Sequence, residues 1–540
     1  MCISLSAGDP INPRASTVRR TFLSIVIDHR DRMSESPPNV QPPTPAEIRE
    51  YARRHHIDLT DQEVEDFEAA IAETLLGYER LDQLPDYRPR VEYTDRDPGY
   101  RPGPDEDPLN AFVTKCEVTG ADDGPLAGYE VGLKDNVNLA GVELTVGSKL
   151  FEGYVPSTDA TIVTRLLDAG ATITGKLNME DMAFSGSGEL SATGPVLNPV
   201  DSDYIAGGSS SGSAAAVGNG DVDVAIGGDQ GGSIRIPAAW SGLVGHKPTH
   251  SLVPYTGIVG LGRSFDHAGP ICSTVDDCAR VLDVIAGNDG LDPRQGVVPT
   301  DDYREVLSDD PSDVTVGVIK EGFGHEVSES GVDDTVRDAL TAFEDAGATV
   351  TEVSVPMHLD GLTIWNAIAL EETAATVDSE GVGHYGKGFY DTQLADAFGR
   401  ARRSDADDYI TTLKLTLVLG EYLADEYRGH YYAKAQNLSR KLAEEYDDAL
   451  ADVDVLAMPT TPQTAHAVDE SISRLEAIDR ALNMLHNTAP FDVTGHPATS
   501  VPAGTADGLP VGLMLIGERF DDATVLSSAY AFEQHIETGL

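Results

Sequence analysis

The fold is best predicted from residues 203–249, which read DYIAGGSSSGSAAAVGNGDVDVAIGGDQGGSIRIPAAWSGLVGHKPT. Glycine, serine and alanine are concentrated around two serine clusters, and a short apolar run, VDVAI at 222–226, lies between the clusters. Valine and isoleucine alternate there with aspartate and alanine, which predicts a short, half-buried β-strand. A helical segment at 213–217 is expected before the strand. The stretch therefore predicts a helix and a strand flanked by two serine-bearing loops.

The glycines that follow this strand indicate a ligand-binding turn at Ser233. Glycine permits backbone angles that other residues avoid, so main-chain N–H groups can approach a bound ligand closely. Ser233 can therefore lie at the mouth of a turn that binds an oxyanion. For GGSSSG at 207–212 taken alone, a solvated Gly/Ser linker is an equally good interpretation.

A resemblance to a known family comes from the longer pattern. GGSSSGSAAAV at 207–217 and GGDQGGSIRIPAAWSGLVGHKPT at 227–249 resemble the signature of the amidase signature family, and GLKDN at 132–136 resembles its catalytic lysine segment. Further segments look like bacterial amidases of the branch that accompanies nitrile degradation, the enantioselective amidases; they lie at 159–188, 265–271, 321–327 and 487–504. The resemblance covers residues 105–535.

This resemblance implies a catalytic triad. Ser233 would be the nucleophile, Lys134 the base, and Ser209, preceded by a cis peptide bond, the bridge between them. The implied oxyanion donors are the backbone N–H groups of Gln230, Gly231, Gly232 and Ser233. No metal or cofactor is implied.

The chemistry of the base can be argued from the residues themselves. Amide hydrolysis needs a base that later protonates the leaving amine, and a lysine can accept a proton only when it is neutral. The lysine pKa is normally about 10.4, and burial lowers it because desolvation penalises the ammonium. The apolar strand before Lys134 is consistent with burial. The alternative is that Lys134 forms a surface ion pair with Asp135.

Other residues are expected to support the site. Arg235 is predicted to pair with a buried carboxylate, with Asp229 as the candidate, in a structural salt bridge that holds the loop. Ser210 is a candidate hydrogen-bonding residue behind the triad. The candidates for lining or closing the acyl pocket are Phe184, Ser185, Gly186, Trp365 and Tyr432.

A competing interpretation concerns GSSSG at 208–212, which satisfies the G-x-S-x-G pattern of the α/β-hydrolase nucleophile elbow. That elbow should directly follow a strong strand, whereas NPVDSDYIA at 198–206 is a poor one. His246 is only a loosely placed candidate partner. No Walker lysine follows the glycines, which argues against phosphate binding, and none of the 14 histidines stands in a metal-like cluster of the sequence.

Composition limits the class of protein. The 540 residues include 90 Asp and Glu against 38 Lys and Arg, which gives a formal net charge of −52 and argues against nucleic-acid binding. Periodic apolar segments argue against global disorder. An acidic, solvated surface keeps a protein soluble in concentrated salt, so we expect a halophilic source.

Cysteine usage and hydropathy favour a cytoplasmic protein without a membrane partner. Four cysteines, Cys2, Cys116, Cys272 and Cys278, show no disulfide-dense pattern. No apolar run approaches the roughly 18 residues that a membrane span needs.

The chain is expected to have four parts. We expect disorder over 1–43 with Met33 as a candidate initiator, a helical module over 44–84, a proline-rich linker or strap over 85–108, and a catalytic domain over 109–540. Capping boxes at Thr44 and Thr60 predict the two helices of the module. The resemblance implies that the module serves in a homodimer; packing on its own core is the alternative.

Strands and helices alternate along the catalytic domain, which predicts an α/β fold. Strands are expected at 128–133, 171–174, 314–319, 349–353, 453–458 and 513–516, and helices at 159–169 and 332–346. A mostly helical region at 360–440 is expected to cover the substrate. The resemblance implies the amidase signature fold, a central mixed β-sheet covered by helices on both faces.

These features predict an amidase that converts linear carboxamides, as small-molecule substrates, to carboxylic acids and ammonia through an acyl-Ser233 intermediate. One alternative is the glutamine-hydrolysing component of a tRNA-dependent amidotransferase, whose catalytic core begins much nearer the amino terminus. A catalytically silent binding relative is the other.

Overall fold

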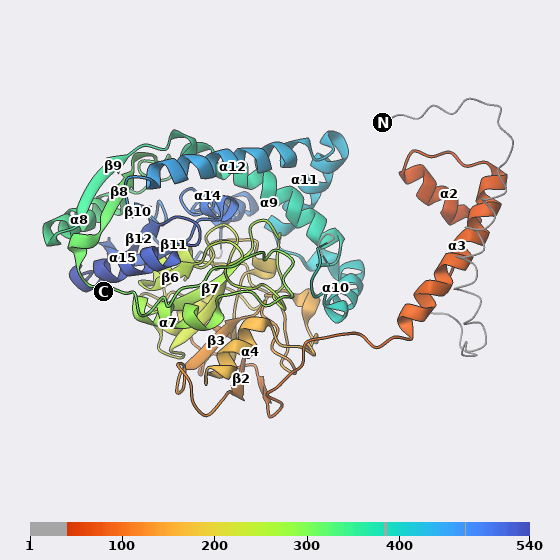
Figure 1. Cartoon of the computed structure of the whole chain (residues 1–540), viewed down its shortest axis with the longest axis horizontal. Helices are drawn as coiled ribbons and strands as arrows, with labels where there is room; N and C mark the ends of the chain where they lie inside the picture. The colour runs from red at the N-terminus through yellow and green to blue at the C-terminus, as the bar shows by residue number, and fades with distance from the viewer. Residues whose placement is uncertain (1–39, 383–385, 470, 540) are drawn as a thin grey trace. The chain divides into compact units, whose positions relative to one another are not determined.

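The computed structural model describes residues 40–382, 386–469 and 471–539 (Figure 1). The chain divides into two compact units, Met1–Arg88 and Pro89–Leu540. The expectations for residues 1–39, including an initiator at Met33, lie outside the described residues.

Within its described residues, 40–88, the first unit contains two helices, α2 (Pro45–Arg54) and α3 (Asp61–Asp82). Both predicted capping boxes are confirmed: the Thr44 hydroxyl accepts from Glu47 N while the Glu47 carboxylate accepts from Thr44 N, and the pattern repeats after Thr60. These reciprocal bonds satisfy amide groups that have no partner inside the helix.

The second unit is built on one mixed sheet. Among the described residues it has 12 strands in the order β1-β2-β4-β3-β5-β7-β6-β11-β12-β10-β8-β9. Strand β3 is parallel to β4 and β5, and β8 is parallel to β9 and β10, whereas the other neighbours are antiparallel. The predicted mixed sheet is confirmed. The strands are β1 Asp97–Tyr100, β2 Phe112–Thr119, β3 Glu130–Lys134, β4 Thr172–Leu177, β5 Val224–Asp229, β6 Val244–Lys247, β7 His267–Cys272, β8 Thr315–Ile319, β9 Thr349–Val353, β10 Val455–Pro459, β11 Ala498–Ala506 and β12 Leu509–Ile516.

The central strands β5 and β12 are buried along their whole length, because helices cover the sheet. Helix α7 contacts α4 and α15, and α15 contacts α8, while α5 and α6 pack together as a second group. Helices α9, α11 and α12 gather at one side of this unit, and α4 and α7 lie at the other (Figure 1). The bounds are α4 Thr161–Asp168, α5 Ser211–Gly218, α6 Arg235–Ser241, α7 Val275–Ile285, α8 Ser330–Ala346, α9 Gly361–Asp378, α10 Thr392–Asp405, α11 Thr411–Tyr427, α12 His430–Leu450, α13 Arg474–Leu482, α14 Pro490–Thr494 and α15 Asp522–His535.

The strand expected at 222–226 differs from the prediction in place and burial. Strand β5 begins at Val224, continues through Gly227 and Gly228, and is buried at every residue. It lies between β3 and β7, so it is a central strand and not a half-exposed one. The glycines are needed for packing: a Cβ on Gly227 would lie 2.9 Å from Ile234 Cγ1 and 3.0 Å from Ser210 Oγ. The other predicted strands and helices are confirmed, with bounds shifted by a few residues.

The second half of the proline-rich segment is fastened to the second unit. Strand β1 pairs with β2. The Arg96 guanidinium donates to both carboxylate oxygens of Asp159, at 2.7 and 2.6 Å. Both side chains are almost fully buried, so a bidentate ion pair and a strand pairing hold this segment in place.

Candidate active site

Lys134 is the last residue of β3, and it is brought to the serine clusters by the pairing of β3 with β5. These strands are parallel, so their carboxyl ends lie at the same edge of the sheet, as in other α/β sites. Lys134 Nζ lies 2.7 Å from Ser209 Oγ and 3.2 Å from Gly228 O. The structure therefore joins two of the three predicted triad residues directly.

The surroundings of Lys134 change its acid–base behaviour. The side chain is completely buried, and burial lowers the pKa of Lys134 to about 7, although the carboxyl groups of Asp229, Glu180 and Asp266 act in the opposite direction. The alternative of a surface ion pair with Asp135 is wrong, because the Asp135 carboxylate instead accepts from Lys176 Nζ at 2.8 Å.

Ser209 follows a cis peptide bond from Gly208, as the resemblance implies. Its carbonyl oxygen accepts from Glu180 N at 3.2 Å. The Glu180 side chain is buried beside this peptide, where a Cβ on Gly208 would lie 3.0 Å from Glu180 Cγ. Sequence reasoning missed Glu180, although it lies inside the resembling segment 159–188.

Glu180 holds together the glycine-rich loop that contains three of the pocket candidates, Phe184, Ser185 and Gly186. Its carboxyl group accepts from Ser185 Oγ at 3.1 Å, from Leu190 N at 2.6 Å and from Gly188 N. Burial raises the pKa of Glu180 to about 7, and the hydrogen bonds it accepts oppose that rise. The Ser185 hydroxyl is thus engaged in fixing its own loop.

Ser210 connects the two serine clusters. Its Oγ donates to Gly228 O at 3.1 Å and accepts from Gly228 N at 3.2 Å, while its amide donates to Ser233 O at 3.3 Å. This hydrogen bonding places the loop that bears Ser209 against the loop that bears Ser233. Ser233 itself is buried and lies two residues before the first residue of helix α6.

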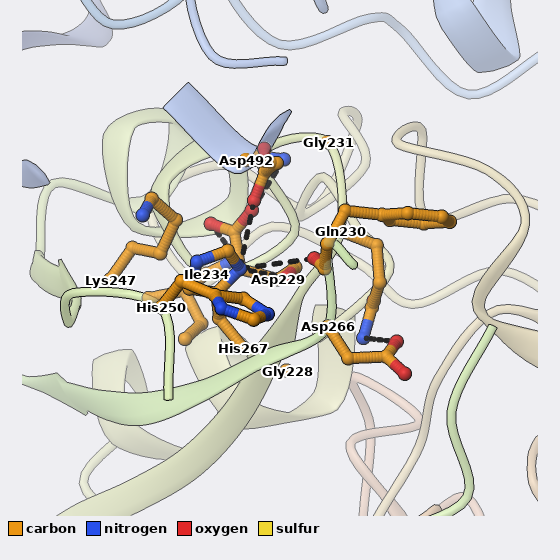
Figure 2. A network of polar contacts seen from close by, with 12 residues as sticks. Gly228, Asp229, Gln230, Gly231, Ile234, Lys247, His250, Asp266, His267 and Asp492 are labelled. Carbon is orange, nitrogen blue, oxygen red and sulfur yellow. Dashed lines mark hydrogen bonds and ion pairs between the residues drawn. The ribbon is translucent and has the colours of Figure 1, made fainter. Parts of the chain in front are cut away.

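The predicted pairing of Arg235 with Asp229 is confirmed, and a second carboxyl group, that of Asp492, joins it. Figure 2 labels both aspartates in this network. The Arg235 guanidinium donates to both oxygens of Asp229, each at 3.0 Å, and to Asp492 Oδ2 at 2.9 Å. All three side chains are fully buried. Sequence reasoning missed Asp492, which lies in the resembling segment 487–504.

The two carboxyl groups of this network differ in acidity. Burial would raise the pKa of Asp229, but the charges of Arg235 and Lys247 hold it well below its usual range. Burial and the neighbouring Asp229 raise the pKa of Asp492 well above its usual range. Asp229 is therefore the carboxylate of the pair, and its two oxygens also accept from Gly232 N at 2.6 Å and Ile234 N at 3.1 Å.

The Gln230 side chain points away from this network toward Asp266 (Figure 2). Its Nε2 donates to Asp266 Oδ1 at 3.1 Å and to Tyr255 Oη at 2.8 Å. Burial raises the pKa of Asp266 to about 6, and Arg294 opposes that rise. The Gln230 side chain is thus held within the protein, and its backbone amide is the part that remains at the turn.

The backbone amides of the turn divide into two groups. Gly232 N–H donates to Asp229, whereas the N–H groups of Gln230, Gly231 and Ser233 donate to no acceptor within the described ranges. Three of the four amides expected to bind an oxyanion are therefore free, and the fourth is engaged in holding the turn.

Of the remaining pocket candidates, Trp365 contacts the turn directly. Trp365 Nε1 donates to Gln230 O at 2.6 Å, and a Cβ on Gly186 would lie 2.7 Å from Met484 Sδ. The hydroxyl of Tyr432 instead donates to Glu372 at 3.1 Å. Phe184 is buried.

The elbow interpretation receives no support from His246. Its ring bonds Thr499 Oγ1 at 2.8 Å and Asp522 Oδ1 at 3.2 Å, whereas the Ser210 hydroxyl bonds only the backbone of Gly228 within the part of the chain that the structure describes.

Among the described residues, no group of three His, Cys, Asp or Glu side chains could hold a metal ion. No described helix is both long and apolar enough to cross a membrane.

The protein family described as Amidase matches residues 110–526 of this chain. The chain belongs to the amidase signature family. It is 44% identical over 506 residues to an enantioselective amidase of Rhodococcus rhodochrous, an alignment that covers 92% of this chain and 96% of the relative. It is 40% identical over 436 residues to a glutamyl-tRNA(Gln) amidotransferase subunit of Halobacterium salinarum, an alignment that covers 79% of this chain and 100% of the relative.

Solved structures of this family share the fold. The corresponding glutamyl-tRNA(Gln) amidotransferase subunit of Thermotoga maritima is 33% identical with a TM-score of 0.67, covering 80% of this chain and 90% of that one. The peptide amidase of Stenotrophomonas maltophilia is 32% identical with a TM-score of 0.63, covering 76% of this chain and 83% of that one. Both structures belong to proteins that are named for reactions at amide nitrogen.

Proposed function

We propose that this protein is an amidase that hydrolyses linear carboxamides to carboxylic acids and ammonia through an acyl-Ser233 intermediate. The observation that carries the proposal is the Lys134 amine, which is buried, has a pKa of about 7 and lies 2.7 Å from Ser209 Oγ. A lysine in this state can accept a proton near neutral pH, as general-base catalysis requires.

In the proposed acylation step, Ser233 Oγ attacks the amide carbonyl carbon and a C–O bond forms. The Ser233 proton passes to Ser209 Oγ while the Ser209 proton passes to Lys134 Nζ. When the C–N bond breaks, the same relay returns the proton to the leaving nitrogen and ammonia departs. Water then attacks the acyl carbon by the same relay, which releases the carboxylic acid and restores Ser233.

We further propose that the N–H groups of Gln230, Gly231 and Ser233 bind the tetrahedral oxyanion. These three groups have no other acceptor among the residues that the structure describes, which supports this role. Donors fixed in a buried turn stabilise a developing charge more than donors in water do. Gly232 N–H, expected as a fourth donor, would instead keep the turn in shape through Asp229.

The coverage of the relatives favours an amidase over an amidotransferase component. The alignment with the enantioselective amidase covers 92% of this chain, whereas that with the Halobacterium protein covers 79%. The longer alignment with the amidase is long enough to include the helical module that precedes the catalytic unit. The amidotransferase component remains the second candidate, since many relatives of this kind match.

A catalytically silent relative is disfavoured because Lys134, Ser209 and Ser233 are all present.

Ammonia release from propionamide, benzamide and glutamine tests the proposal, with Ser233→Ala as the control, in about 2 M KCl, where surface charge is strongly screened. We expect release from one or both simple amides and none from the variant. Release from glutamine alone would favour the amidotransferase component. A folded protein that releases no ammonia and takes no fluorophosphonate at Ser233 would favour the silent relative.

We also infer a homodimer that works in a salty cytoplasm. The net charge of −52 supports the salt requirement. The exposed apolar residues of the helical module, which include Phe67 at 44% and Leu81 at 61%, support association. Light scattering and thermal melting from about 0.1 to 3 M KCl test both inferences, and we expect a dimer whose melting temperature rises with salt.

A further inference from the structure

The carbonyl groups of the nucleophile turn are held by side chains from distant parts of the chain. Trp365, on helix α9, donates from Nε1 to Gln230 O at 2.6 Å. Thr488, which precedes helix α14, donates from Oγ1 to Gly231 O at 2.6 Å. Both donors are buried, so water does not compete for these carbonyls.

Fixing a carbonyl also fixes the amide that follows it. A trans peptide unit is planar, and its C=O and N–H groups point in opposite directions. Thr488 illustrates the rule, because the amide that follows its carbonyl partner is Gly232 N–H, which points to Asp229 Oδ1 at 2.6 Å. Trp365 acts in the same way on the preceding peptide unit, so the Gly231 N–H must point away from the indole.

The N–H groups of these two peptide units differ in whether they have an acceptor. The amide opposite Thr488 meets the Asp229 carboxylate, whereas the amide opposite Trp365 meets no acceptor in the described part of the chain. A free, fixed N–H beside Ser233 is what an oxyanion requires. Thr488 therefore orients an amide that has a structural acceptor, whereas Trp365 orients an amide that is free to bind a ligand.

We propose that Trp365 is a positioning residue for oxyanion binding: its indole N–H holds the Gln230 carbonyl so that the Gly231 N–H stays directed at the substrate oxygen in the tetrahedral state. This inference rests on the proposed function. This role differs from the pocket-lining role that the sequence suggests for Trp365. A residue that lines the pocket affects the affinity for the substrate, whereas a positioning residue affects the stability of the transition state.

The packing of the indole agrees with this role. A Cβ on Gly231 would lie 2.9 Å from Trp365 Cζ2 and 3.5 Å from Trp365 Nε1. The ring therefore packs on the turn itself. It lies so close to residue 231 that only glycine, which has no Cβ, fits there. The indole fixes the peptide from one side by contact and hydrogen bonding, which leaves the other side for the ligand.

Trp365→Phe is the direct test, since it keeps an aromatic ring and removes the N–H donor. We expect kcat to fall about 10- to 100-fold, somewhat less than the loss of a whole oxyanion donor, with KM changed by less than about twofold. The rate at which a fluorophosphonate labels Ser233 should fall by the same factor as kcat, because its phosphoryl oxygen occupies the same position. Circular dichroism and the melting temperature show whether the variant is folded.

Site-specific replacement of Trp365 by 3-benzothienylalanine is the second variant, because sulfur takes the place of the N–H with almost no change of shape. Thr373→Val is the matched control on the same helix: the Thr373 hydroxyl is buried and has no partner within the described residues. We expect this control to keep the wild-type kcat, KM and labelling rate.

The outcomes separate the two proposals. Labelling of wild-type Ser233 that is absent in Ser233→Ala supports the proposed function, and failure to label wild type contradicts it whatever Trp365 does. If wild type labels normally, a wild-type kcat and labelling rate in a folded variant that lacks the indole N–H would overturn the role of Trp365. A higher KM with unchanged kcat would also overturn it, since that result is expected of a pocket wall.

Discussion

Two buried lysines on neighbouring strands show what distinguishes the proposed base from a structural cation. Lys134 ends β3 and Lys176 lies in β4, and the two strands pair in parallel. Both side chains are completely buried. Lys176 Nζ has the Asp135 carboxylate at 2.8 Å. Over the described part of the chain, Lys134 Nζ has only the neutral oxygens of Ser209 and Gly228 within hydrogen-bonding distance.

The comparison teaches that burial alone does not make a base. A buried ion pair recovers part of its desolvation cost from the attraction of its partner. A lysine whose contacts are neutral recovers much less, so its neutral form is favoured. Asp135 is next to Lys134 in the sequence, but in the structure it pairs with Lys176. The spatial contact, and not the position in the sequence, therefore decides which lysine has a charged partner. Substitutions at the two lysines and around the turn test this contrast.

The largest effect is expected for Lys134→Met. Methionine fills a similar volume without a charge or a proton acceptor, so kcat should fall by about 10³- to 10⁴-fold. The free energy of unfolding should change by less than about 1.5 kcal/mol, since no counter-charge is left behind. Steady-state kinetics and urea unfolding in salt measure the two quantities. A variant that retains a tenth of the wild-type kcat would show that Lys134 is not the base.

Lys176→Met should have the opposite effects, with a large loss of stability and a small change in kcat. It leaves the buried Asp135 carboxylate without its partner, so the free energy of unfolding should fall by about 3–5 kcal/mol. The protein that remains folded should keep kcat within a fewfold of wild type.

Lys176→Met combined with Asp135→Asn is the matched control for this prediction. The double variant has no unpaired charge at the site, so it should recover a large part of the lost stability. If the single and double variants were equally unstable, packing and not charge would explain the effect of Lys176.

Arg235→Lys is expected to have an intermediate effect. Lysine keeps the positive charge but loses the planar fork that reaches Asp229 and Asp492 together. We expect a loss of about 1–3 kcal/mol in the free energy of unfolding. Thermal and urea unfolding measure this loss. An unchanged stability would mean that the charge alone, without the bidentate geometry, holds the turn.

Ser210→Ala should have the smallest effect. It removes the two hydrogen bonds between the Ser210 hydroxyl and the backbone of Gly228. We expect about 1–2 kcal/mol of lost stability and no change in the pH at which activity rises, since Lys134 keeps its contacts. A loss of activity as large as that of Lys134→Met would instead favour Ser210 as the nucleophile.

Much of the fold could be predicted because its signals are local. The capping boxes at Thr44 and Thr60 lie within four residues, and the α/β alternation follows short periodic segments. The ordered glycine and serine clusters indicated Ser209 and Ser233, and the apolar strand indicated the burial of Lys134.

The rest depends on contacts that no short segment contains. Asp492 reaches Arg235 from 257 residues away, and Trp365 reaches Gln230 from 135 residues away. The pairing of Asp135 with Lys176 is decided by strand order, which local patterns do not specify. The alternating pattern of β5 suggested one exposed face, but its central place in the sheet covers both faces.

The pH dependence of kcat/KM is the sharpest test of Lys134 as the base, because it reports ionisations of the free enzyme. Lys134 must be neutral to accept the proton, so kcat/KM should be low below pH 7, rise through the Lys134 pKa of about 7 and then level off. The carboxyl groups of Glu180 and Asp266, whose pKa values are raised to about 7 and about 6, lie near Lys134 and remain in Lys134→Met.

Wild type and Lys134→Met should therefore be compared from pH 5.5 to about 9.5 in the same salt. We predict a rise of close to tenfold per pH unit below the pKa for wild type, and no such rise in the residual activity of the variant. A flat wild-type profile, or the same rise in both proteins, would contradict the assignment of Lys134 as the base.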